Sequence, residues 1–196
     1  MDRETFAEIM EATGRALRTH GYADLTMQRI ADESSMTTAA IHYHFDTKNE
    51  LLNAFLEDLI ERFEGELACE ARDPRERLEA FLDVIFTPVE ADDDDDDFPI
   101  ALMELKAQAP YHETYRERFL ELDETMRDVV ATAVRDGIDE GYFEESDPEA
   151  VARAVVTAIN GSHVRRVALG EDPEATRRAV GEYLALRLGW SPEVVA

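Results

Sequence analysis

Apolar residues recur at helical spacing along most of the chain, and no segment shows the sustained alternation with hairpin turns that is typical of strands. The pattern therefore predicts an all-helical protein. Proline, glycine and capping residues divide the pattern into about nine helices. We expect them at about residues 3–20, 27–34, 38–45, 48–71, 74–87, 98–109, 111–140, 148–170 and 173–188.

Two of the predicted helices, at residues 27–34 and 38–45, are short and lie close together in the sequence. Thr26 and Thr37 precede them, and threonine is a common N-cap because its hydroxyl accepts a hydrogen bond from an amide of the first turn. With the helix before them, they have the spacing of a helix-turn-helix. We predict a DNA-binding domain at residues 1–50 and a larger ligand-binding and dimerisation bundle at residues 51–196.

Charge is distributed unevenly around the second short helix. The chain has a formal net charge of -25 and contains 45 acidic residues, yet residues 34–45 include no Asp, Glu, Lys or Arg. A carboxylate on a helix that enters the major groove would face phosphates, so a neutral surface suits DNA binding. The structural alternative is a short helix buried in an all-helical bundle.

The overall composition resembles that of proteins from salt-accumulating cells. Acidic residues outnumber the 20 basic ones by more than two to one, and only Lys48 and Lys106 are lysines. Such a charge keeps a protein soluble where ions screen its self-repulsion. We therefore predict a cytoplasmic protein of a halophile; the alternative is an ordinary acidic protein.

Several classes of function receive no support from the sequence. The single Cys69 excludes an intramolecular disulfide and a cysteine-rich zinc site. The N-terminal sequence MDRETFAEIM lacks the apolar core of a signal peptide, and no apolar run is long enough for a membrane span. We expect a soluble intracellular protein with no metal and no cofactor.

The stretch GYADLTMQRIADESSMTTAAIHYHFDTKNELL, residues 21–52, resembles the N-terminal signature of the TetR family of transcriptional regulators. The resemblance covers about the first 55 residues, and the rest of the chain agrees in architecture alone. It implies a helix-turn-helix that binds a double-stranded DNA operator.

The resemblance also implies which residues contact the phosphate backbone. Thr26 and Thr37 would offer hydroxyls and amides to phosphates, and Lys48 would place a cation at the start of the next helix. Tyr43 would contact the backbone as well, and His44 would support Tyr43 or bind DNA itself.

The same resemblance implies that the exposed side of the second short helix recognises base edges through a hydroxyl, methyl groups and an imidazole. The residues expected there are Thr38, Ala39, Ala40 and His42. Met36, Ile41 and Phe45 are expected to be buried instead.

The sequence departs from the family pattern at three positions. Ser35 stands where the family usually has glycine, so we expect a turn strained by a positive φ. Thr38 and Asp46 replace positions that are commonly basic. With fewer cations, phosphate neutralisation should be weaker and base contacts should carry more of the affinity, which suits molar salt.

For the body of the protein, the resemblance implies an apolar effector pocket and a twofold dimer built from the last two helices. Pocket candidates are Phe81, Ile85, Phe86, Met103, Tyr115, Phe119 and Met126, and each could equally be plain core. Dimer candidates are Val155, Val156, Ile159, Val164, Val180, Leu184 and Leu188, with Gly161 and Gly181 allowing close approach. A twofold dimer predicts a pseudo-palindromic operator.

The main hypothesis is a ligand-responsive repressor that acts as a homodimer and is not an enzyme; an activator remains open, and the effector is unknown. One alternative is an acidic interaction protein that no longer binds DNA. A di-iron enzyme is another, although no histidine has a glutamate three residues before it. The aspartates at 92–97 are expected to form solvated coil rather than a calcium loop, and His112 and His163 to be capping or hydrogen-bonded residues.

Overall fold

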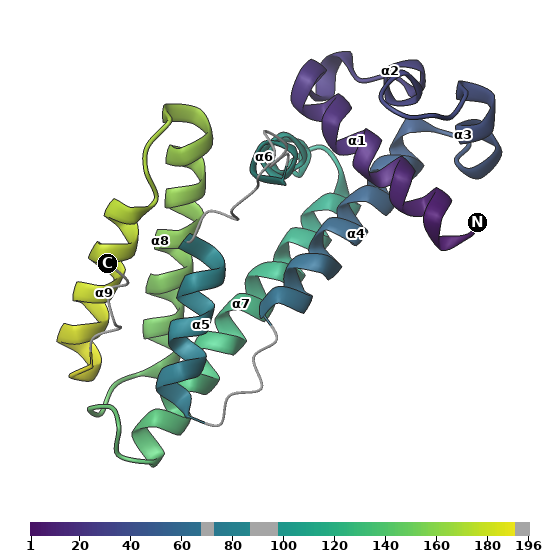
Figure 1. Cartoon of the computed structure of the whole chain (residues 1–196). Helices are drawn as coiled ribbons and strands as arrows, with labels where there is room; N and C mark the ends of the chain where they lie inside the picture. The colour runs from purple at the N-terminus through teal and green to yellow at the C-terminus, as the bar shows by residue number, and fades with distance from the viewer. Residues whose placement is uncertain (68–72, 87–97, 191–196) are drawn as a thin grey trace. The chain divides into compact units, whose positions relative to one another are not determined.

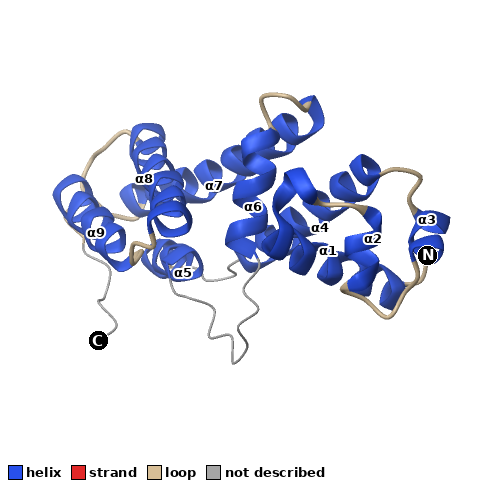
Figure 2. Cartoon of the chain, turned by 90° about the horizontal axis from the view of Figure 1, so that it is seen from above, coloured by secondary structure: helices blue, strands red, loops and turns tan. Residues whose placement is uncertain are grey.

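The computed structural model describes residues 1–67, 73–86 and 98–190. Within these ranges the chain forms nine helices and no strand, which confirms the predicted all-helical fold (Figure 1 and Figure 2). None of the helices described is long and apolar enough to span a bilayer. The helices are α1 (Arg3–Asp24), α2 (Met27–Asp32), α3 (Thr38–His44), α4 (Lys48–Leu67), α5 (Pro74–Phe86), α6 (Phe98–Gln108), α7 (Glu113–Asp139), α8 (Pro148–Leu169) and α9 (Glu174–Leu188).

The helix boundaries differ from the predicted ones by a few residues. Helix α1 continues past the predicted stop to Asp24, but Gly21 interrupts it with φ 68° and ψ 166°. Glycine adopts this conformation because it has no Cβ to clash with the backbone. Helix α7 begins at Glu113 rather than at residue 111. The aspartates at 92–97 and Cys69 lie outside the described residues, so the predictions about them stay predictions.

The chain divides into two compact units. Unit 1 consists of residues 1–62 and 89–120, and unit 2 of residues 63–88 and 121–196. Helices α4 and α7 therefore contribute residues to both units. The predicted functional boundary at residue 50 does not coincide with the division between these units, and it stays a prediction.

Unit 1 holds the two short helices on a buried apolar core. Helix α1 packs against both α2 and α6, and α2 packs against α3. Because the buried positions on α1 recur every three or four residues, they form one face of this helix that lies in the core of unit 1. The fully buried side chains of this core include Ile9, Met10, Leu17, Ile30, Ile41, Leu51, Leu52 and Leu56.

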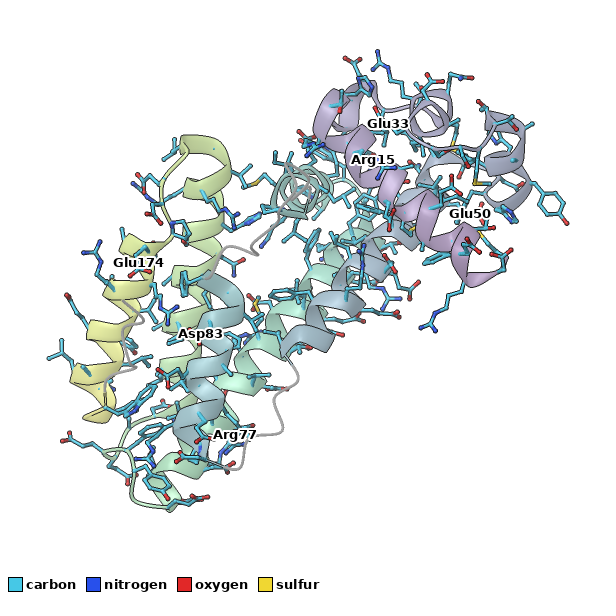
Figure 3. The ribbon with its side chains drawn as sticks, in the orientation of Figure 1. Arg15, Glu33, Glu50, Arg77, Asp83 and Glu174 are labelled. Atoms are coloured by element: carbon cyan, nitrogen blue, oxygen red, sulfur yellow. The ribbon has the colours of Figure 1, made fainter. Side chains whose placement is uncertain are left out.

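Unit 2 is a bundle in which α9 packs against α8 and α5. Its apolar core is reinforced by two ion pairs, each with a nitrogen-to-oxygen distance of 2.6 Å: Arg77 with Asp136, and Arg177 with Asp83. These pairs join α5 to α7 and α5 to α9 (Figure 3 labels Arg77 and Asp83).

Most of the side chains expected at the dimer interface are buried within the single chain, so their role at an interface stays a prediction. Six of the seven side chains expected at an interface are at most 7% exposed in the single chain. They lie in the core of their own bundle. An apolar stripe that faces a neighbouring helix has the same sequence pattern as one that faces a second copy, so the pattern alone does not distinguish them. The six are Val155, Val156, Ile159, Val180, Leu184 and Leu188. Val164 is the exception, with 48% of its side chain exposed.

Candidate nucleic-acid interface

The two short helices begin at the threonine caps that the sequence predicts. The hydroxyl oxygen of Thr26 accepts a hydrogen bond from the amide of Arg29 at 3.2 Å. The hydroxyl oxygen of Thr37 accepts one from the amide of Ala40, also at 3.2 Å. Each cap satisfies an amide that the first helical turn would otherwise leave without a partner.

The turn between α2 and α3 is held by side chains of α1. Oε1 of Glu8 accepts hydrogen bonds from the amide of Ser35 at 2.8 Å and from its hydroxyl at 2.6 Å. Arg15 donates to the backbone oxygen of Glu33 at 2.7 Å, and its Nε lies 3.9 Å from the Glu33 carboxylate (Figure 3). The hydroxyl oxygen of Ser34 accepts from the amide of Met36 at 3.0 Å.

These contacts overturn the expectation of a strained turn at Ser35. Among the described residues, every residue with positive φ is a glycine. Ser35 does not have a positive φ, so the turn needs no glycine at this position, and the Glu8 carboxylate satisfies its amide and hydroxyl. The same two hydrogen bonds lower the pKa of Glu8, with the Ser35 hydroxyl as the largest cause.

Helix α3 exposes a neutral surface. Tyr43 has 85% of its side chain exposed, and its ring lies 5.0 Å from that of His44 in an edge-on arrangement. Ile41 and Phe45 are buried as expected, which fixes the opposite side of the helix in the core. Met36 is half-buried rather than buried. The predicted DNA contacts on this helix are either exposed (Thr37, Ala39, His42, Tyr43) or half-buried (Thr38, Ala40, His44).

A hydrogen-bond chain that the sequence did not indicate connects α2 to α3. The hydroxyl of Thr38 donates to Oε1 of Gln28 at 2.7 Å. Nε2 of Gln28 in turn donates to Oδ1 of Asp32 at 2.7 Å. Gln28 lies on the exposed side of α2, so the chain borders the surface formed by α3.

Lys48 lies at the start of α4 but directs its ammonium group toward the protein. Its Nζ donates to the backbone oxygens of Leu25 at 3.0 Å and of Tyr22 at 3.3 Å. It also lies 4.8 Å from the centroid of the Tyr22 ring, a cation–π distance. At most one of its three N–H groups is therefore left for a phosphate.

Tyr22 joins the end of α1 to three other parts of unit 1. Besides accepting from Lys48, its backbone amide donates to Oε2 of Glu104 on α6 at 3.0 Å. Its phenol oxygen lies 3.0 Å from Nε2 of His112, which agrees with the prediction that this histidine is hydrogen-bonded. The positive φ of Gly21 brings the chain to this position.

Cations are sparse around α2 and α3. Arg29 donates to the backbone oxygen of Asp24 at 2.5 Å, so part of its guanidinium is engaged within the protein. The carboxylate of Glu50 accepts from the amide of Asp46 at 2.9 Å (Figure 3 labels Glu50). A surface with so few cations would neutralise few phosphates and gain little from counterion release.

The side chains expected to line an effector pocket are divided between the two units. In unit 1, Tyr115 is 1% exposed, Phe119 is 9% exposed and Met103 is half-buried. In unit 2, Phe81, Phe86 and Met126 are buried and Ile85 is half-buried. These positions suit plain core as well as a lining, so the pocket stays a prediction.

Tyr115 differs from the other candidates because it carries a buried hydroxyl, which has no hydrogen-bond partner among the residues that the structure describes. Burial raises the pKa of Tyr115, so the phenol stays protonated and can donate. A buried hydroxyl without a partner carries a desolvation cost of about 1 to 3 kcal/mol. In the described ranges, no three His, Cys, Asp or Glu side chains lie close enough together to hold a metal ion.

The fold and this surface define a helix-turn-helix protein, and two family models match its sequence. Residues 74–189 match the family model described as "BetI-type transcriptional repressor, C-terminal", and residues 9–55 match "Bacterial regulatory proteins, tetR family". The chain belongs to the TetR family of transcriptional regulators.

Individual proteins similar to this chain are also transcriptional regulators. The crystal structure of a TetR transcription regulator from Haloarcula marismortui is 42% identical, with a TM-score of 0.85, and the match covers 95% of this chain and 100% of that one. The regulator TtgR from Pseudomonas putida is 42% identical over 59 residues, 30% of this chain and 28% of that protein. The repressor KstR2 from Rhodococcus jostii is 24% identical over 143 residues, covering 69% of this chain and 66% of that protein.

Proposed function

We propose that the protein is a homodimeric, ligand-responsive repressor that binds a pseudo-palindromic DNA operator through α3. The observation that carries the proposal is the neutral, exposed surface of this helix, where Tyr43 is 85% exposed in a chain of net charge -25. Apart from its edge-on contact with His44, an aromatic ring so exposed contributes little to the packing of its own chain. A polyanionic partner accounts for both its exposure and the absence of carboxylates.

The hydrogen-bond roles of the caps suit contact with phosphates. Because the oxygens of Thr26 and Thr37 accept from amides, their hydroxyl protons stay available to donate. Phosphate oxygens are acceptors, so both threonines can position the duplex. The phenol of Tyr43 can donate in the same way, with His44 packed edge-on against its ring. Thr38, Ala39, Ala40 and His42 then face the bases.

A second copy of the chain would bind the exposed apolar residues of α8 and α9. Val164 is 48% exposed, Leu169 is 63% exposed and Leu186 is 84% exposed. Gly161 is exposed on α8, and a Cβ added there would lie more than 4 Å from the other described parts of the chain, apart from the backbone of its own helix turn. A twofold dimer would present its two α3 helices about 34 to 36 Å apart, one turn of DNA.

The effector would carry a hydrogen-bond acceptor. The hydroxyl of Tyr115 is buried without a partner and its phenol is protonated, so an acceptor delivered by a small molecule would remove its desolvation cost. Phe119 and Met103, which are buried and half-buried in the same unit, would contact the apolar part of such a molecule.

The coupling between effector and DNA would run through α6. Glu104 on this helix accepts from the amide of Tyr22, where α1 ends, and α1 supports the turn before α3 through Glu8. An effector that favours another position of α6 would disturb the end of α1. The effect is a population shift between two states with different effector affinity.

High salt would be the working environment, in the cytoplasm of a halophile. The ratio of 45 acidic to 20 basic residues supports this proposal, as does the 42% identity to a regulator from Haloarcula marismortui. At molar ionic strength the Debye length is about 3 Å, so the charge of the body is screened from the DNA.

A second candidate is an acidic interaction protein without DNA binding. It is favoured by the inward direction of the Lys48 ammonium and by the carboxylates of Asp32 and Asp46 near α3. A gel-shift titration in concentrated KCl with the DNA upstream of the protein's own gene separates the two. The repressor proposal requires a discrete shift that competitor DNA of random sequence does not remove. Absence of any shift would favour the interaction protein.

A further inference from the structure

The chain of hydrogen bonds from Thr38 through Gln28 to Asp32 has only one possible direction. An ionised carboxylate is an acceptor, so the group of Gln28 that faces Asp32 at 2.7 Å must be its NH2. The other end of the amide, the carbonyl Oε1, then faces the hydroxyl of Thr38 at 2.7 Å. A carbonyl cannot donate. Thr38 must therefore supply the proton of that bond.

The direction of this bond decides what Thr38 can offer to DNA. A threonine hydroxyl has one proton and two lone pairs, and here the proton is used within the protein. What remains toward solvent is acceptor capacity. This distinguishes Thr38 from Thr26 and Thr37, whose oxygens accept from amides and whose protons stay available. The free capacity of the Thr38 hydroxyl is therefore to accept a hydrogen bond, whereas the hydroxyls of Thr26 and Thr37 can donate one.

A hydroxyl that can only accept and a hydroxyl that can donate bind different groups of the DNA duplex. Phosphate oxygens are acceptors and suit Thr26 and Thr37, but they cannot bind a hydroxyl that only accepts. In the major groove, adenine N6 and cytosine N4 donate, whereas guanine O6 and thymine O4 accept. An acceptor-only Thr38 can therefore bind an amino group of adenine or cytosine, and it would face a lone pair at guanine or thymine.

We propose that Gln28, oriented by Asp32, fixes Thr38 as a hydrogen-bond acceptor, so that Thr38 selects adenine or cytosine over guanine or thymine at one position of each operator half-site. The inference rests on the proposed function, because it requires that α3 enters the major groove. Gln28 is a positioning residue in this scheme: it acts through Thr38, and its substitution should change base preference at a single position.

The direct test is selection of binding sites from randomised duplex DNA in concentrated KCl, followed by titration of the selected sites. The wild-type protein should yield one position per half-site at which adenine and cytosine are accepted and guanine and thymine are rejected. Thr38→Val, which keeps the shape and removes the hydroxyl, should lose this discrimination. Thr38→Ser should keep it. Discrimination of about 3- to 10-fold corresponds to the loss of one neutral hydrogen bond.

Gln28→Ala is the critical variant because it frees the Thr38 hydroxyl to rotate and donate. At the same position it should accept guanine or thymine as readily as adenine or cytosine, while preferences elsewhere stay unchanged. Asp32→Asn should have the same effect, since a neutral amide no longer dictates the direction of the Gln28 amide. Asp46→Asn is the matched control: it removes the same charge from the head and should raise affinity without changing any base preference.

Base analogues identify the atom that is bound. Replacing the selected adenine with purine, which lacks the N6 amino group, should weaken binding by about 3- to 10-fold. Replacing it with 7-deazaadenine should have no effect, because N7 is an acceptor that Thr38 does not need.

Two results would overturn the inference but leave the proposed function intact. One is unchanged base preferences in both Thr38→Val and Gln28→Ala. The other is a wild-type preference for guanine or thymine that Thr38→Val removes. If the wild-type protein selects no sequence at all, the proposed function fails and the inference falls with it. Unaltered helical content and unfolding temperature of each variant establish that the protein remains folded.

Discussion

One carboxylate oxygen of Glu8 accepts two hydrogen bonds from Ser35, a residue 27 positions further along the chain. The contact connects the first turns of α1 to the turn that precedes α3. The turn before α3 is therefore supported by a side chain outside the two helices of the motif.

Glu8→Ala should weaken DNA binding because α3 loses the support of its preceding turn. The control is Glu11→Ala, which removes an exposed carboxylate from the same helix and leaves Ser35 in place. Both variants lose one negative charge, so simple electrostatics predicts equal gains in affinity. Fluorescence anisotropy with operator DNA compares them, and equal affinities of the two variants would contradict a role for the Glu8 contact.

The same contact predicts a pH dependence of stability. The pKa of Glu8 is lowered in the folded protein, so the unfolded state takes up its proton first as the pH falls. The contribution of Glu8 is complete above the ordinary glutamate pKa of 4.5 and is lost as the pH falls below that value through the lowered one. Thermal unfolding as a function of pH should show wild type and Glu8→Ala differing at neutral pH and converging in acid.

Tyr115→Phe should leave the free energy of unfolding unchanged or raise it, because it removes a buried hydroxyl that has no partner. Tyr22→Phe makes the same chemical change in the same unit but deletes the bond to His112, and should cost about 0.5 to 1.5 kcal/mol. Chemical denaturation compares the pair. Only Tyr115→Phe should also weaken the response to an effector found by thermal-shift screening.

Lys48→Met should lower the free energy of unfolding by about 1 to 3 kcal/mol, because the backbone oxygens of Tyr22 and Leu25 lose a charged donor. The dependence of DNA affinity on salt should change little. If the ammonium binds a phosphate in the complex instead, the slope of log affinity against log salt falls by about one. Denaturation and salt titration of the same variant distinguish these roles.

Leu186→Glu should shift the protein from dimer to monomer, because it places a charge on an apolar side chain that is 84% exposed in the single chain. Leu120→Glu is the control, since Leu120 is 53% exposed but lies in unit 1. Sedimentation in concentrated KCl measures both. Dimers that persist in Leu186→Glu but dissociate in Leu120→Glu would place the interface elsewhere.

The sequence predicted those parts of the head that depend on neighbouring residues. Helical periodicity located each helix within the described ranges. The caps at Thr26 and Thr37 form as expected because capping is a contact within one turn. Ile41 and Phe45 are buried, since their spacing assigns them to the inner side of α3.

Helical periodicity and capping residues did not predict the contacts between distant segments of the chain. Nothing in the sequence indicated that Glu8 would satisfy Ser35, that the ammonium of Lys48 would turn toward the end of α1, or that Gln28 would bind Thr38. Each depends on how two helices pack, which periodicity does not specify. The apolar stripes of α8 and α9 do not separate core from interface for a related reason: both bury the same kinds of side chain.

The central claim is that the neutral surface of α3 lies against DNA, and inserting a carboxylate there tests it most directly. Ala39 on α3 and Ala107 on α6 are both exposed, so Ala39→Glu and Ala107→Glu add the same charge to different surfaces of unit 1. In an anisotropy titration with operator DNA in concentrated KCl, Ala39→Glu should lose at least about tenfold in affinity, or 1.4 kcal/mol, while Ala107→Glu binds like the wild type. Equal affinities for the two variants would contradict the account.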